Sequence, residues 1–544
     1  MEIFKWSNPD LYFLIVISIL NAIMMCFLSY KFLQIIQLSD YKLNQYGTWL
    51  KDTKAKWVSR IAMLCFLSFC FVYVTNVLFN NFQDNKILGY IGLVFYFALV
   101  IVFIKKMYQI PQKKPLKLTK RMFRLYLIEF LLYLALDFGL LVVCLEYTNN
   151  FRVSIVTLIP ITIPIVVPLA CAIAYPIEKL ISACYKKACI NRLKKRPDLI
   201  RIGITGSYGK TSTKMYLTKF LETKFKVCAT PASYNTPMGI TKVVRNELKP
   251  DDQILIAEMG AKQKGDIKEL CDMVNPDAGI ITAVGEQHMD TFKTLDNVLN
   301  TKFELAESLK EDAVCVFNCA SENTKKLYDR CTLKNKIAVC SNDSFVFAKD
   351  IVATENGLEF KLCYNKKEYQ TNTSILGEHN IQNILCAVAL ALKFGVTIEE
   401  ILKVIPTLEA VEHRLQLKKL EDNILIIDDS FNSNIQGTAV ALKTLNLFDG
   451  KRKIVVTPGL VELGKRENVE NYELGKRIAK VADLVIIVNK NQCDSIKKGL
   501  LDAGFKSENI FLQDTLFEVT DLFKTLLKSG DVVLLENDLP DNYK

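Results

Sequence analysis

The chain has 544 residues, of which 50% are hydrophobic and 23% charged, and its formal net charge is +11. That length allows roughly three or four domains of about 150 residues each. The mean hydropathy is positive, and the apolar residues gather in the first third of the chain, which indicates a membrane protein with a large soluble part. The basic residues lie beside the apolar runs, where membrane topology uses them, so the charge does not indicate a nucleic-acid partner. The 16 cysteines include no Cys-x-x-Cys pair, so neither a zinc site nor a disulfide framework is predicted.

Five apolar segments are each long enough to cross a bilayer, which takes about 20 residues. They are Leu11–Tyr30, Val58–Phe79, Ile87–Ile104, Leu125–Glu146 and Val153–Tyr175. A transmembrane domain of five helices is therefore expected over residues 1–176. Pro160, Pro164 and Pro168 predict a broken or kinked helix in the last segment. That break is either a plain packing kink or the wall of a lipid or substrate groove.

The basic residues between these segments predict an orientation. Residues 31–57 carry five lysines, residues 105–124 eight lysines or arginines, and residues 177–197 seven, whereas the alternate connections carry one each. Basic loops stay on the cytoplasmic side of a membrane. We therefore expect a multi-pass protein of the cytoplasmic (inner) membrane, with its N-terminus outside and the chain after Tyr175 in the cytoplasm. Residues 177–198 form a basic juxtamembrane linker.

After residue 198 the pattern changes to short β-prone runs that alternate with amphipathic helices, which is typical of a doubly wound parallel sheet. A central α/β domain is expected over residues 199–414, with a helix at Asn380–Phe394. Its strands are expected at Leu199–Thr205, Ile254–Glu258, Gly279–Val284, Ala313–Asn318 and Ile337–Cys340. Within residues 342–375 we expect a small antiparallel insert of two strands, Phe345–Ala353 and Leu358–Tyr364.

A second α/β domain is expected over residues 415–544. Its strands are expected at Asn423–Asp428, Lys453–Thr457, Asp483–Val488, Asn509–Gln513 and Val532–Glu536. The domain has no Gly-x-Gly-x-x-Gly, so its Rossmann-like pattern does not indicate dinucleotide binding.

The stretch Ile202–Met215 passes from a β-prone run into a glycine-rich turn and then into a helix-compatible segment. The turn contains Gly206-x-x-Gly209-Lys210-Thr211, which suits phosphate. Glycines let backbone N–H groups surround phosphate oxygens, the helix N-terminus adds positive dipole, the lysine reaches the outer phosphates, and the threonine hydroxyl can hold Mg²⁺. The strict pattern Gly-x4-Gly-Lys-Ser/Thr is not met, because an isoleucine stands at its first glycine. The turn therefore indicates a nucleotide-binding loop, with an ordinary strand-to-helix turn as the alternative.

Three further residues carry possible phosphate or metal chemistry. Glu258 ends an apolar strand beside the expected loop, where a Mg²⁺ ligand is wanted, although an ordinary strand-end acid fits as well. His288 closes the next strand at the same sheet edge, and it is one of three histidines in the chain. Lys302 lies on the helix that follows and by itself indicates a solvated face.

Polar residues also mark the approach to the second α/β domain. Asn380 and Asn383 stand at the start of a helix, where they suit capping or a base edge. Arg414 marks the join between the two domains. Residues 428–434, Asp-Asp-Ser-Phe-Asn-Ser-Asn, follow a strand at the edge where open sheets bind ligands. A turn rich in capping residues is the alternative.

Seven motifs occur in the order in which they occur in the Mur ligases. They are Gly-Ile-Thr-Gly-Ser-Tyr-Gly-Lys-Thr-Ser, Glu-Met-Gly-Ala, a strand-end histidine, Gly-Glu-His-Asn-x-x-Asn, His-Arg-Leu, Asp-Asp-Ser-Phe-Asn-Ser-Asn and Pro-Gly-Leu-Val-Glu-Leu-Gly. Residues 198–544 resemble the central ATP-binding and C-terminal domains of that family, and look most like its MurF branch, which adds D-alanyl-D-alanine in peptidoglycan synthesis. The five apolar segments stand in the place of the family's N-terminal UDP-binding domain.

The resemblance implies ATP-dependent amide formation through an acyl phosphate. It implies that Lys210, His288 and Lys302 are catalytic, and that Lys302 is carbamoylated as in many members of the family. It also implies two Mg²⁺ ions, with Thr211, Glu258, His288 and Lys302 as ligands. Domain closure would exclude water from the intermediate.

For ATP itself, the resemblance implies contacts from the loop, from the two asparagines near adenine, and from the domain join near ribose and phosphates. These residues are Gly206, Ser207, Gly209, Lys210, Thr211, Ser212, Asn380, Asn383, Arg414 and Asp429.

The leading hypothesis is a membrane-anchored, ADP-forming carbon–nitrogen ligase of MurF type. It would join a carboxylate-bearing cell-wall or envelope precursor, UDP-linked or lipid-linked, to an amino acid or dipeptide amine. A synthase of a poly-amino-acid envelope polymer is a close variant. An ATP-binding membrane scaffold that does not ligate is the alternative from another class, and it would have no need of the second-metal residues. ATP, Mg²⁺ and membrane lipid are the expected partners, and nucleic acid is not.

Overall fold

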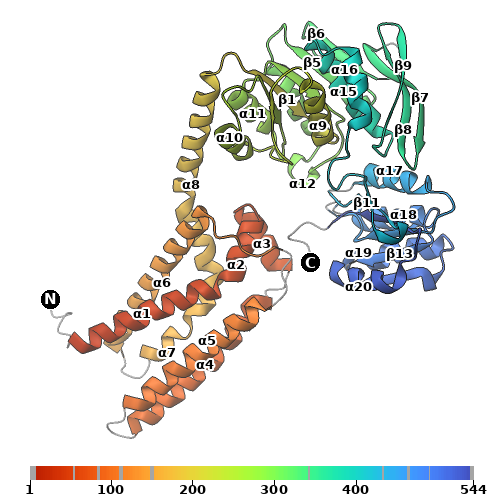
Figure 1. Cartoon of the computed structure of the whole chain (residues 1–544). Coiled ribbons are helices and arrows are strands. Elements are labelled where there is room, and N and C mark those ends of the chain that lie inside the picture. The colour runs from red at the N-terminus through yellow and green to blue at the C-terminus, as the bar shows by residue number, and fades with distance from the viewer. Residues whose placement is uncertain are drawn as a thin grey trace. The chain divides into compact units, whose positions relative to one another are not determined.

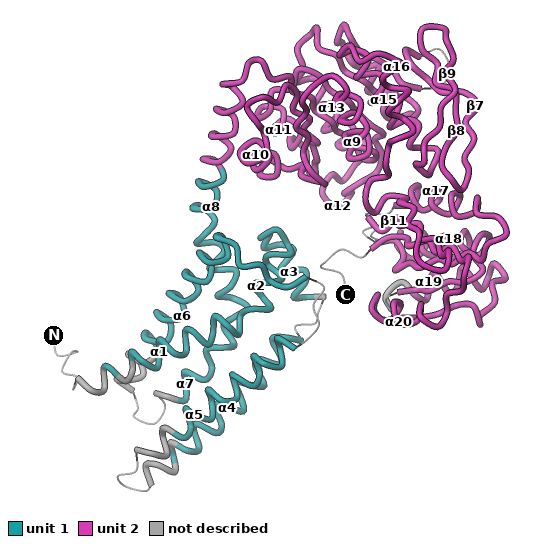
Figure 2. The backbone as a smooth tube through the Cα atoms, viewed as in Figure 1, with its two compact units in different colours: residues 1–182, 540–544 teal, residues 183–539 magenta. Residues whose placement is uncertain are grey.

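A computed structural model describes residues 8–538 except 53–55, 82–85, 110–113, 148–151, 341–343, 432–433, 462, 464–465 and 489. The chain divides into two compact units, one of residues 1–182 with 540–544 and the other of residues 183–539 (Figure 2). The described part of the first unit is helical, and the second unit is α/β (Figure 1).

The first unit consists of helices where the apolar segments predict them. They are α1 (Asn8–Leu28), α2 (Tyr30–Leu38), α3 (Leu43–Asp52), α4 (Lys56–Asn81), α5 (Lys86–Tyr108), α6 (Lys120–Tyr147), α7 (Arg152–Val156) and α8 (Ile163–Lys194). Among the described residues, three stretches are long and apolar enough to cross a membrane, namely Lys56–Thr75, Ile91–Tyr108 and Ser154–Lys194. The bent pair Ile15–Leu28 and Tyr30–Leu38 makes a fourth if it is one span.

The number of candidate spans is thus three or four, where five were expected. α6 covers the fourth expected segment, but it is not among the candidates found in the described residues. Its charged side chains Glu129 and Asp137 lie inside the bundle and are fully buried. Asp137 Oδ1 accepts a hydrogen bond from Asn21 Nδ2 at 2.7 Å, and Glu129 Oε2 accepts one from Ser29 Oγ at 2.9 Å. Hydrogen bonds of this kind join helices where an apolar face alone does not.

The prolines of the last segment act differently from one another. Pro160 lies in the short 3₁₀ turn Ile159–Thr162, which separates α7 from α8 as the expected break does. Pro168 lies inside α8, which continues through it. A proline cannot donate to the carbonyl four residues earlier, here Pro164 O. Tyr46 Oη donates to that carbonyl instead, at 3.1 Å, so the helix continues without an unsatisfied group at this point.

The second unit begins with a six-stranded parallel sheet in the order β2-β3-β1-β4-β5-β6. Its strands are β1 (Ile200–Thr205), β2 (Val227–Ala229), β3 (Ile254–Glu258), β4 (Ala278–Ile281), β5 (Val314–Asn318) and β6 (Asn335–Val339). Each of the five expected strands overlaps one of these. The strand β2 was not expected, because three residues are too few to form a recognisable apolar run.

Helices cover both faces of this sheet, which is why its strands are nearly unbroken apolar runs. One core packs the sheet against α10 (Pro237–Asn246), α11 (Asp266–Val274), α13 (Leu295–Glu307) and α14 (Glu322–Arg330). The other packs it against α9 (Lys210–Leu221), α15 (His379–Lys393) and α16 (Ile398–Val404). The short α12 (Met289–Phe292) precedes α13.

The insert has three antiparallel strands where two were expected. They are β7 (Val346–Thr354), β8 (Gly357–Tyr364) and β9 (Lys367–Thr373). The sequence of β9, Lys-Glu-Tyr-Gln-Thr-Asn-Thr, is polar on both sides, so alternation of apolar residues does not reveal it.

The last sheet has the order β10-β11-β15-β12-β13-β14 and is parallel except for the pair β10 and β11. Its strands are β10 (Gln416–Lys419), β11 (Leu425–Asp429), β12 (Lys453–Thr457), β13 (Leu484–Val488), β14 (Ile510–Gln513) and β15 (Val532–Glu536). One face packs against α17 (Ile435–Asn446), α18 (Glu467–Ile478) and α19 (Lys490–Asp502), and the other against α20 (Leu516–Leu526). The five expected strands are present, and the short edge strand β10 is additional.

Candidate active site

The expected phosphate loop, residues 206–209, joins β1 to α9. Gly206 has φ +148° and Gly209 φ +80°, and a Cβ on Gly206 would lie 1.9 Å from Thr282 Oγ1. A Cβ on Gly209 would lie 2.2 Å from Asn383 Oδ1. A side chain at either position would therefore strain the backbone and collide with a neighbouring residue. Since β1 lies between β3 and β4, the loop is at the carboxyl edge of the sheet, where α/β folds bind ligands.

Lys210 begins α9 and folds back over the loop. Its Nζ donates to the carbonyls of Gly206 at 2.8 Å and Ser207 at 3.1 Å. Burial, opposed by the Glu258 carboxylate, lowers the pKa of Lys210 to about 8. The amine is thus held beside the loop by carbonyls that a phosphate can replace as its partner.

Of the three hydroxyl side chains at the loop, one holds the loop in place and two lie at the start of α9. Ser207 Oγ donates to Gly285 O at 2.8 Å and accepts from the Gly285 N–H at 3.1 Å, so it fixes the loop to the segment after β4. Thr211 and Ser212 lie buried in the first turn of α9. The first N–H groups of a helix have no partner within it, and together with the helix dipole they attract anions.

Glu258 is the last residue of β3, and it stands in register with Ile204 of β1. Its side chain is 1% exposed. Its Oε2 accepts from Lys214 Nζ at 3.0 Å, and its Oε1 from Asn235 Nδ2 at 3.1 Å. Burial by itself raises the pKa of Glu258, but Lys214, Lys210 and the two hydrogen bonds outweigh it, so the pKa is lowered. Glu258 is therefore a buried, ionised carboxylate beside the loop.

Lys214 was not predicted as part of the site. It lies one turn after Lys210 on α9, is 2% exposed, and also donates to Ala232 O at 2.6 Å. The spacing of four residues from the loop lysine places both on one helix face. That spacing is the signal in the sequence that points to Lys214.

Lys302 lies on α13 and does not form a solvated face, since its side chain is 1% exposed. Burial, and after it the charge of Lys210, lowers the pKa of Lys302 well below its ordinary value. The buried amine of Lys302 is thus protonated less readily than that of a lysine in water. His288 does not close the strand as expected, since β4 ends at Ile281. It precedes α12 with a left-handed backbone, φ +52°, and is half-buried. Its participation in the site stays a prediction.

The residues present fit a nucleotide-bound Mg²⁺ ion. Within the described part of the chain, no three His, Cys, Asp or Glu side chains gather closely enough to hold a metal by themselves. Mg²⁺ usually takes one or two carboxylates and completes its shell with water and substrate phosphates. Glu258 offers such a carboxylate, and Thr211 in the first turn of α9 offers a hydroxyl.

Asn380 and Asn383 lie on α15, which packs against α9, and neither caps its helix. Asn380 Oδ1 accepts from Tyr216 Oη at 3.3 Å and from Asn383 Nδ2 at 3.1 Å. Asn383 Oδ1 accepts from Thr213 Oγ1 at 3.5 Å, and it is the neighbour that a Cβ on Gly209 would meet. Both amides thus fix α15 against α9, and a contact with adenine stays a prediction.

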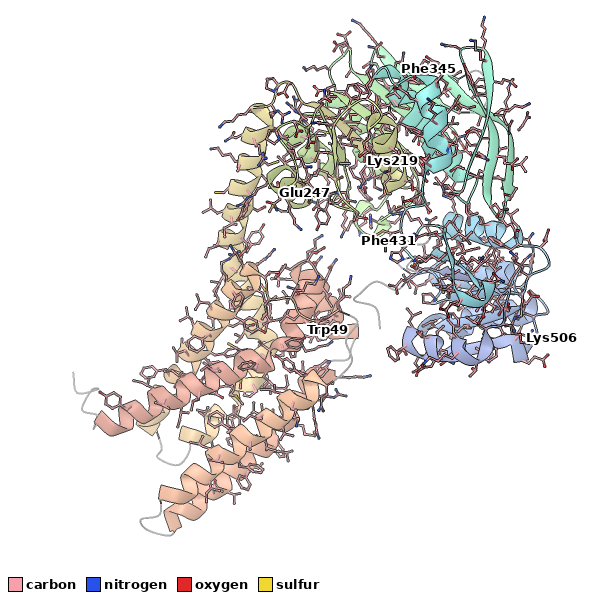
Figure 3. The ribbon with its side chains drawn as sticks, viewed as in Figure 1. Trp49, Lys219, Glu247, Phe345, Phe431 and Lys506 are labelled. Carbon is pink, nitrogen blue, oxygen red and sulfur yellow. The ribbon has the colours of Figure 1, made fainter. Side chains whose placement is uncertain are left out.

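Arg414, at the join between the two α/β domains, interacts electrostatically with Glu258 beside the loop. Burial lowers its pKa, while Glu258 and Asp429 act in the opposite direction. Its guanidinium lies 4.9 Å from the centre of the Phe431 ring, which Figure 3 labels. Asp429 Oδ1 accepts from the Leu415 N–H at 3.1 Å. Burial raises the pKa of Asp429 to about 6, against the effect of that hydrogen bond and of Arg414.

The polar run 428–434 divides into two parts. Asp428 is buried and accepts from Lys418 Nζ at 2.7 Å, and His413 Nδ1 lies 2.8 Å from the same oxygen. Residues 432–433 lie outside the described part of the chain. Asn434 caps α17, because its Oδ1 accepts the N–H groups at positions 436 and 437. The capping alternative is therefore correct for Asn434.

The charges at the loop leave an excess of cations. Lys210, Lys214 and Arg414 all act on the carboxylate of Glu258, and Arg414 also acts on that of Asp429. An arrangement of this kind attracts an anion with several negative charges.

Comparison with known proteins agrees with this geometry. The family description "Mur ligase middle domain" matches residues 204–391, and "Mur ligase, glutamate ligase domain" matches residues 413–536. The UDP-N-acetylmuramoyl-tripeptide–D-alanyl-D-alanine ligase of Bacillus subtilis is 30% identical over 279 residues, which are 51% of this chain and 60% of that protein. The ligase of the same name from Mycobacterium tuberculosis is 27% identical over 356 residues, which are 62% of this chain and 69% of that protein. The match thus spans less than two thirds of the Bacillus enzyme.

Solved structures show the same fold. MurF from Thermotoga maritima in complex with ADP has a TM-score of 0.58 at 26% identity, over 66% of this chain and 80% of that one. MurF from Acinetobacter baumannii has a TM-score of 0.59 at 23% identity, over 66% of this chain and 78% of that one. Through its middle and C-terminal domains, the chain belongs to the Mur ligase family.

Proposed function

We propose that this chain is an ATP-dependent, ADP-forming ligase of MurF type, which joins a carboxylate of a cell-envelope precursor to the amine of an amino acid or dipeptide. The observation that carries the proposal is the set of Lys210, Lys214 and Arg414 around the ionised Glu258 at the phosphate loop. This set suits a triphosphate with a divalent ion, and an ordinary strand-to-helix turn has no need of it. The named activity of the relatives and the ADP bound to the Thermotoga protein support it.

In the proposed reaction the chain positions phosphate and excludes water. Lys210 turns from the loop carbonyls to the phosphoryl group in transfer, and the N–H groups at the start of α9 bind the remaining phosphates. Mg²⁺ held by Glu258 and Thr211 would neutralise phosphate charge. An acceptor carboxylate oxygen attacks the γ-phosphorus and ADP leaves. The amine then attacks the acyl carbon and loses a proton, and inorganic phosphate leaves with the oxygen that it gained.

The nucleotide would also contact the other predicted residues. Gly206, Ser207, Gly209 and Ser212 would surround its phosphates together with Lys210 and Thr211. Asn380 and Asn383 would lie near adenine, and Arg414 and Asp429 near ribose and phosphates. Support comes from their placement, since Asn383 contacts the loop and Arg414 is within electrostatic reach of Glu258.

Lys302 is proposed to carry a carbamoyl group. Its buried amine, whose pKa is lowered, would be the nucleophile for CO₂: an N–C bond forms, the amine loses a proton to water, and the lysine then carries a carbamate. With His288 this carboxylate would serve a second Mg²⁺. Protein equilibrated with ¹³C-bicarbonate should show a carbamate carbon signal that Lys302→Met lacks. An identical spectrum from both proteins would contradict the assignment.

The first unit is proposed as a multi-pass anchor in the cytoplasmic membrane, with the N-terminus outside and the second unit in the cytoplasm. Its three or four candidate spans and the asymmetry of its basic loops support this. Cys184 offers a test, because it is exposed and lies on α8 beyond Tyr175, where the last expected apolar segment ends. A membrane-impermeant maleimide should label it only after cells are permeabilised, with Cys184→Ser as the control, and labelling of intact cells would contradict the orientation.

The activity is tested by phosphate release from ATP by the purified full-length chain. The acceptors are UDP-linked muramoyl peptides and lipid-linked precursors, each with and without D-alanyl-D-alanine or single amino acids. Release that requires both acceptor and amine supports the ligase, and the productive acceptor decides between UDP-linked and lipid-linked substrates. Lys210→Ala should abolish release, while Lys219→Ala, on the exposed side of the same helix, should not. Nucleotide binding without turnover on any pair would favour a scaffold.

A further inference from the structure

We propose that Lys214 competes with the divalent metal ion for Glu258, so that the ion enters the site only as a complex with the nucleotide. The inference rests on the proposed nucleotide function of the loop, and it assigns to Lys214 control over the order in which metal and nucleotide bind.

The geometry places the ammonium group of Lys214 on a carboxylate oxygen of Glu258, the residue proposed to hold the metal ion. Lys214 Nζ lies 3.0 Å from Glu258 Oε2, and the two side chains are 3% and 1% exposed. A metal ion on this oxygen and the Lys214 ammonium group would be two cations on one atom, so each weakens the binding of the other. Because both partners are buried, water does not weaken the pair as it weakens an ion pair at the surface.

The surrounding charges oppose a free divalent cation. Lys210 and Arg414 act on Glu258 together with Lys214, so a bare ion would approach three cationic side chains in a poorly hydrated region. A magnesium–nucleotide complex carries net negative charge, and the same three side chains attract it. The arrangement therefore favours entry of the metal on the nucleotide over entry of the metal alone.

The exchange needs little rearrangement of the protein. Asn235 Nδ2 donates to the other carboxylate oxygen, Oε1, at 3.1 Å, so Glu258 keeps its position when Oε2 changes partner. Lys214 keeps the carbonyl of Ala232 as an acceptor at 2.6 Å. One hydrogen bond is broken, and the released N–H is then free to face the phosphates.

A plain structural ion pair is the alternative, and metal binding distinguishes the two. Mn²⁺ would be titrated by electron paramagnetic resonance into the full-length chain in detergent, without nucleotide. Lys214→Met, which keeps the length of the side chain, should bind Mn²⁺ at least about tenfold more tightly than the unaltered chain, a difference of about 1.4 kcal/mol. Adding Glu258→Gln to Lys214→Met should abolish that gain. Lys219→Met, which removes an exposed lysine of the same helix, should leave Mn²⁺ binding unchanged.

Two results would overturn the proposal. One is that Lys214→Met binds Mn²⁺ without nucleotide no more tightly than the unaltered chain. The other is measured without a variant: the unaltered chain binds Mn²⁺ equally well with and without ADP. ADP binding by the unaltered chain in the presence of Mn²⁺ is measured alongside. If ADP does not bind, the proposed function fails, whereas ADP binding together with either result above refutes the role of Lys214 alone.

Discussion

The substitution Gly209→Ala tests whether the phosphate loop is shaped by Asn383 as well as by its own backbone. Gly209 has φ +80°, and its added Cβ would lie 2.2 Å from Asn383 Oδ1. Gly265, in the same unit, has φ +88° with nothing within 4 Å of the added Cβ. Gly265→Ala therefore introduces the same left-handed strain without the collision, and it serves as the matched control.

The magnitude follows from the two contributions. A left-handed alanine costs about 1 kcal/mol at either position. At Gly209 the Asn383 amide must also move, which disturbs its hydrogen bonds to Thr213 and Asn380. A hydrogen bond of this kind contributes about 1 kcal/mol. We expect Gly209→Ala to cost about 1–2 kcal/mol more than Gly265→Ala.

The assay is the melting temperature of the full-length chain in detergent, followed through the transition of the α/β unit. A cost of 1 kcal/mol corresponds to a shift of about 2–4 °C in domains of this general size. Asn383→Ala in the Gly209→Ala background removes the collision, so the two changes should be less than additive. Equal melting temperatures for Gly209→Ala and Gly265→Ala would refute the assignment of Asn383 as the neighbour that shapes the loop.

Three further expectations concern other parts of the chain. Lys210→Ala should weaken ADP binding by roughly 10- to 100-fold, since a charge-assisted hydrogen bond contributes about 1.5–3 kcal/mol. An affinity for ADP that is unchanged by calorimetry would contradict a role of Lys210 in phosphate binding. Burial raises the pKa of Asp429 to about 6, so its contribution to stability is complete below its ordinary pKa and is lost as the pH rises through about 6. Asp429→Asn should flatten the dependence of melting temperature on pH between those limits, and an unaltered slope would count against a buried Asp429. Asp137→Leu should destabilise the helical unit by about 1–3 kcal/mol relative to Asp137→Asn, because only the leucine leaves the buried Asn21 amide without its acceptor. Equal melting temperatures for the two variants would argue against the hydrogen bond between Asn21 and Asp137.

Much of the fold follows from local pattern. The strands of both parallel sheets are short apolar runs that are buried on two faces, and all the expected ones are present. The strands that the sequence did not predict, β2, β9 and β10, are short or polar. They exist because neighbouring strands offer hydrogen bonds, which is information that no local sequence window contains.

The candidate site shows the same division. The glycines and Lys210 can be recognised because backbone conformation and phosphate chemistry limit the residues allowed there. Lys302 could not be recognised as part of the site from its own helix, since Lys210 and Asp266, which act on its charge, lie on other helices. Lys214 was missed for a related reason: its partners Glu258 and Ala232 are distant in sequence and become neighbours only in the folded sheet.

In the helical first unit, α6 shows where composition alone misleads. Composition predicts a spanning helix, but Glu129 and Asp137 lie inside the bundle. Glu129 accepts from Ser29, 100 positions earlier, and Asp137 accepts from Asn21, 116 positions earlier. Whether such carboxyl groups are tolerated depends on those partners. A count of apolar residues in α6 therefore does not by itself give the number of spans.

The central claim, activation of a carboxylate by ATP, is tested most directly by following an oxygen atom. An acceptor labelled with ¹⁸O in its carboxylate would be converted by the full-length chain in the presence of ATP and the amine, and the inorganic phosphate would be analysed by mass spectrometry. The account predicts one ¹⁸O atom in the phosphate for each amide bond formed, because the oxygen that attacks the γ-phosphorus departs with the phosphate. Amide formation accompanied by unlabelled phosphate would contradict it.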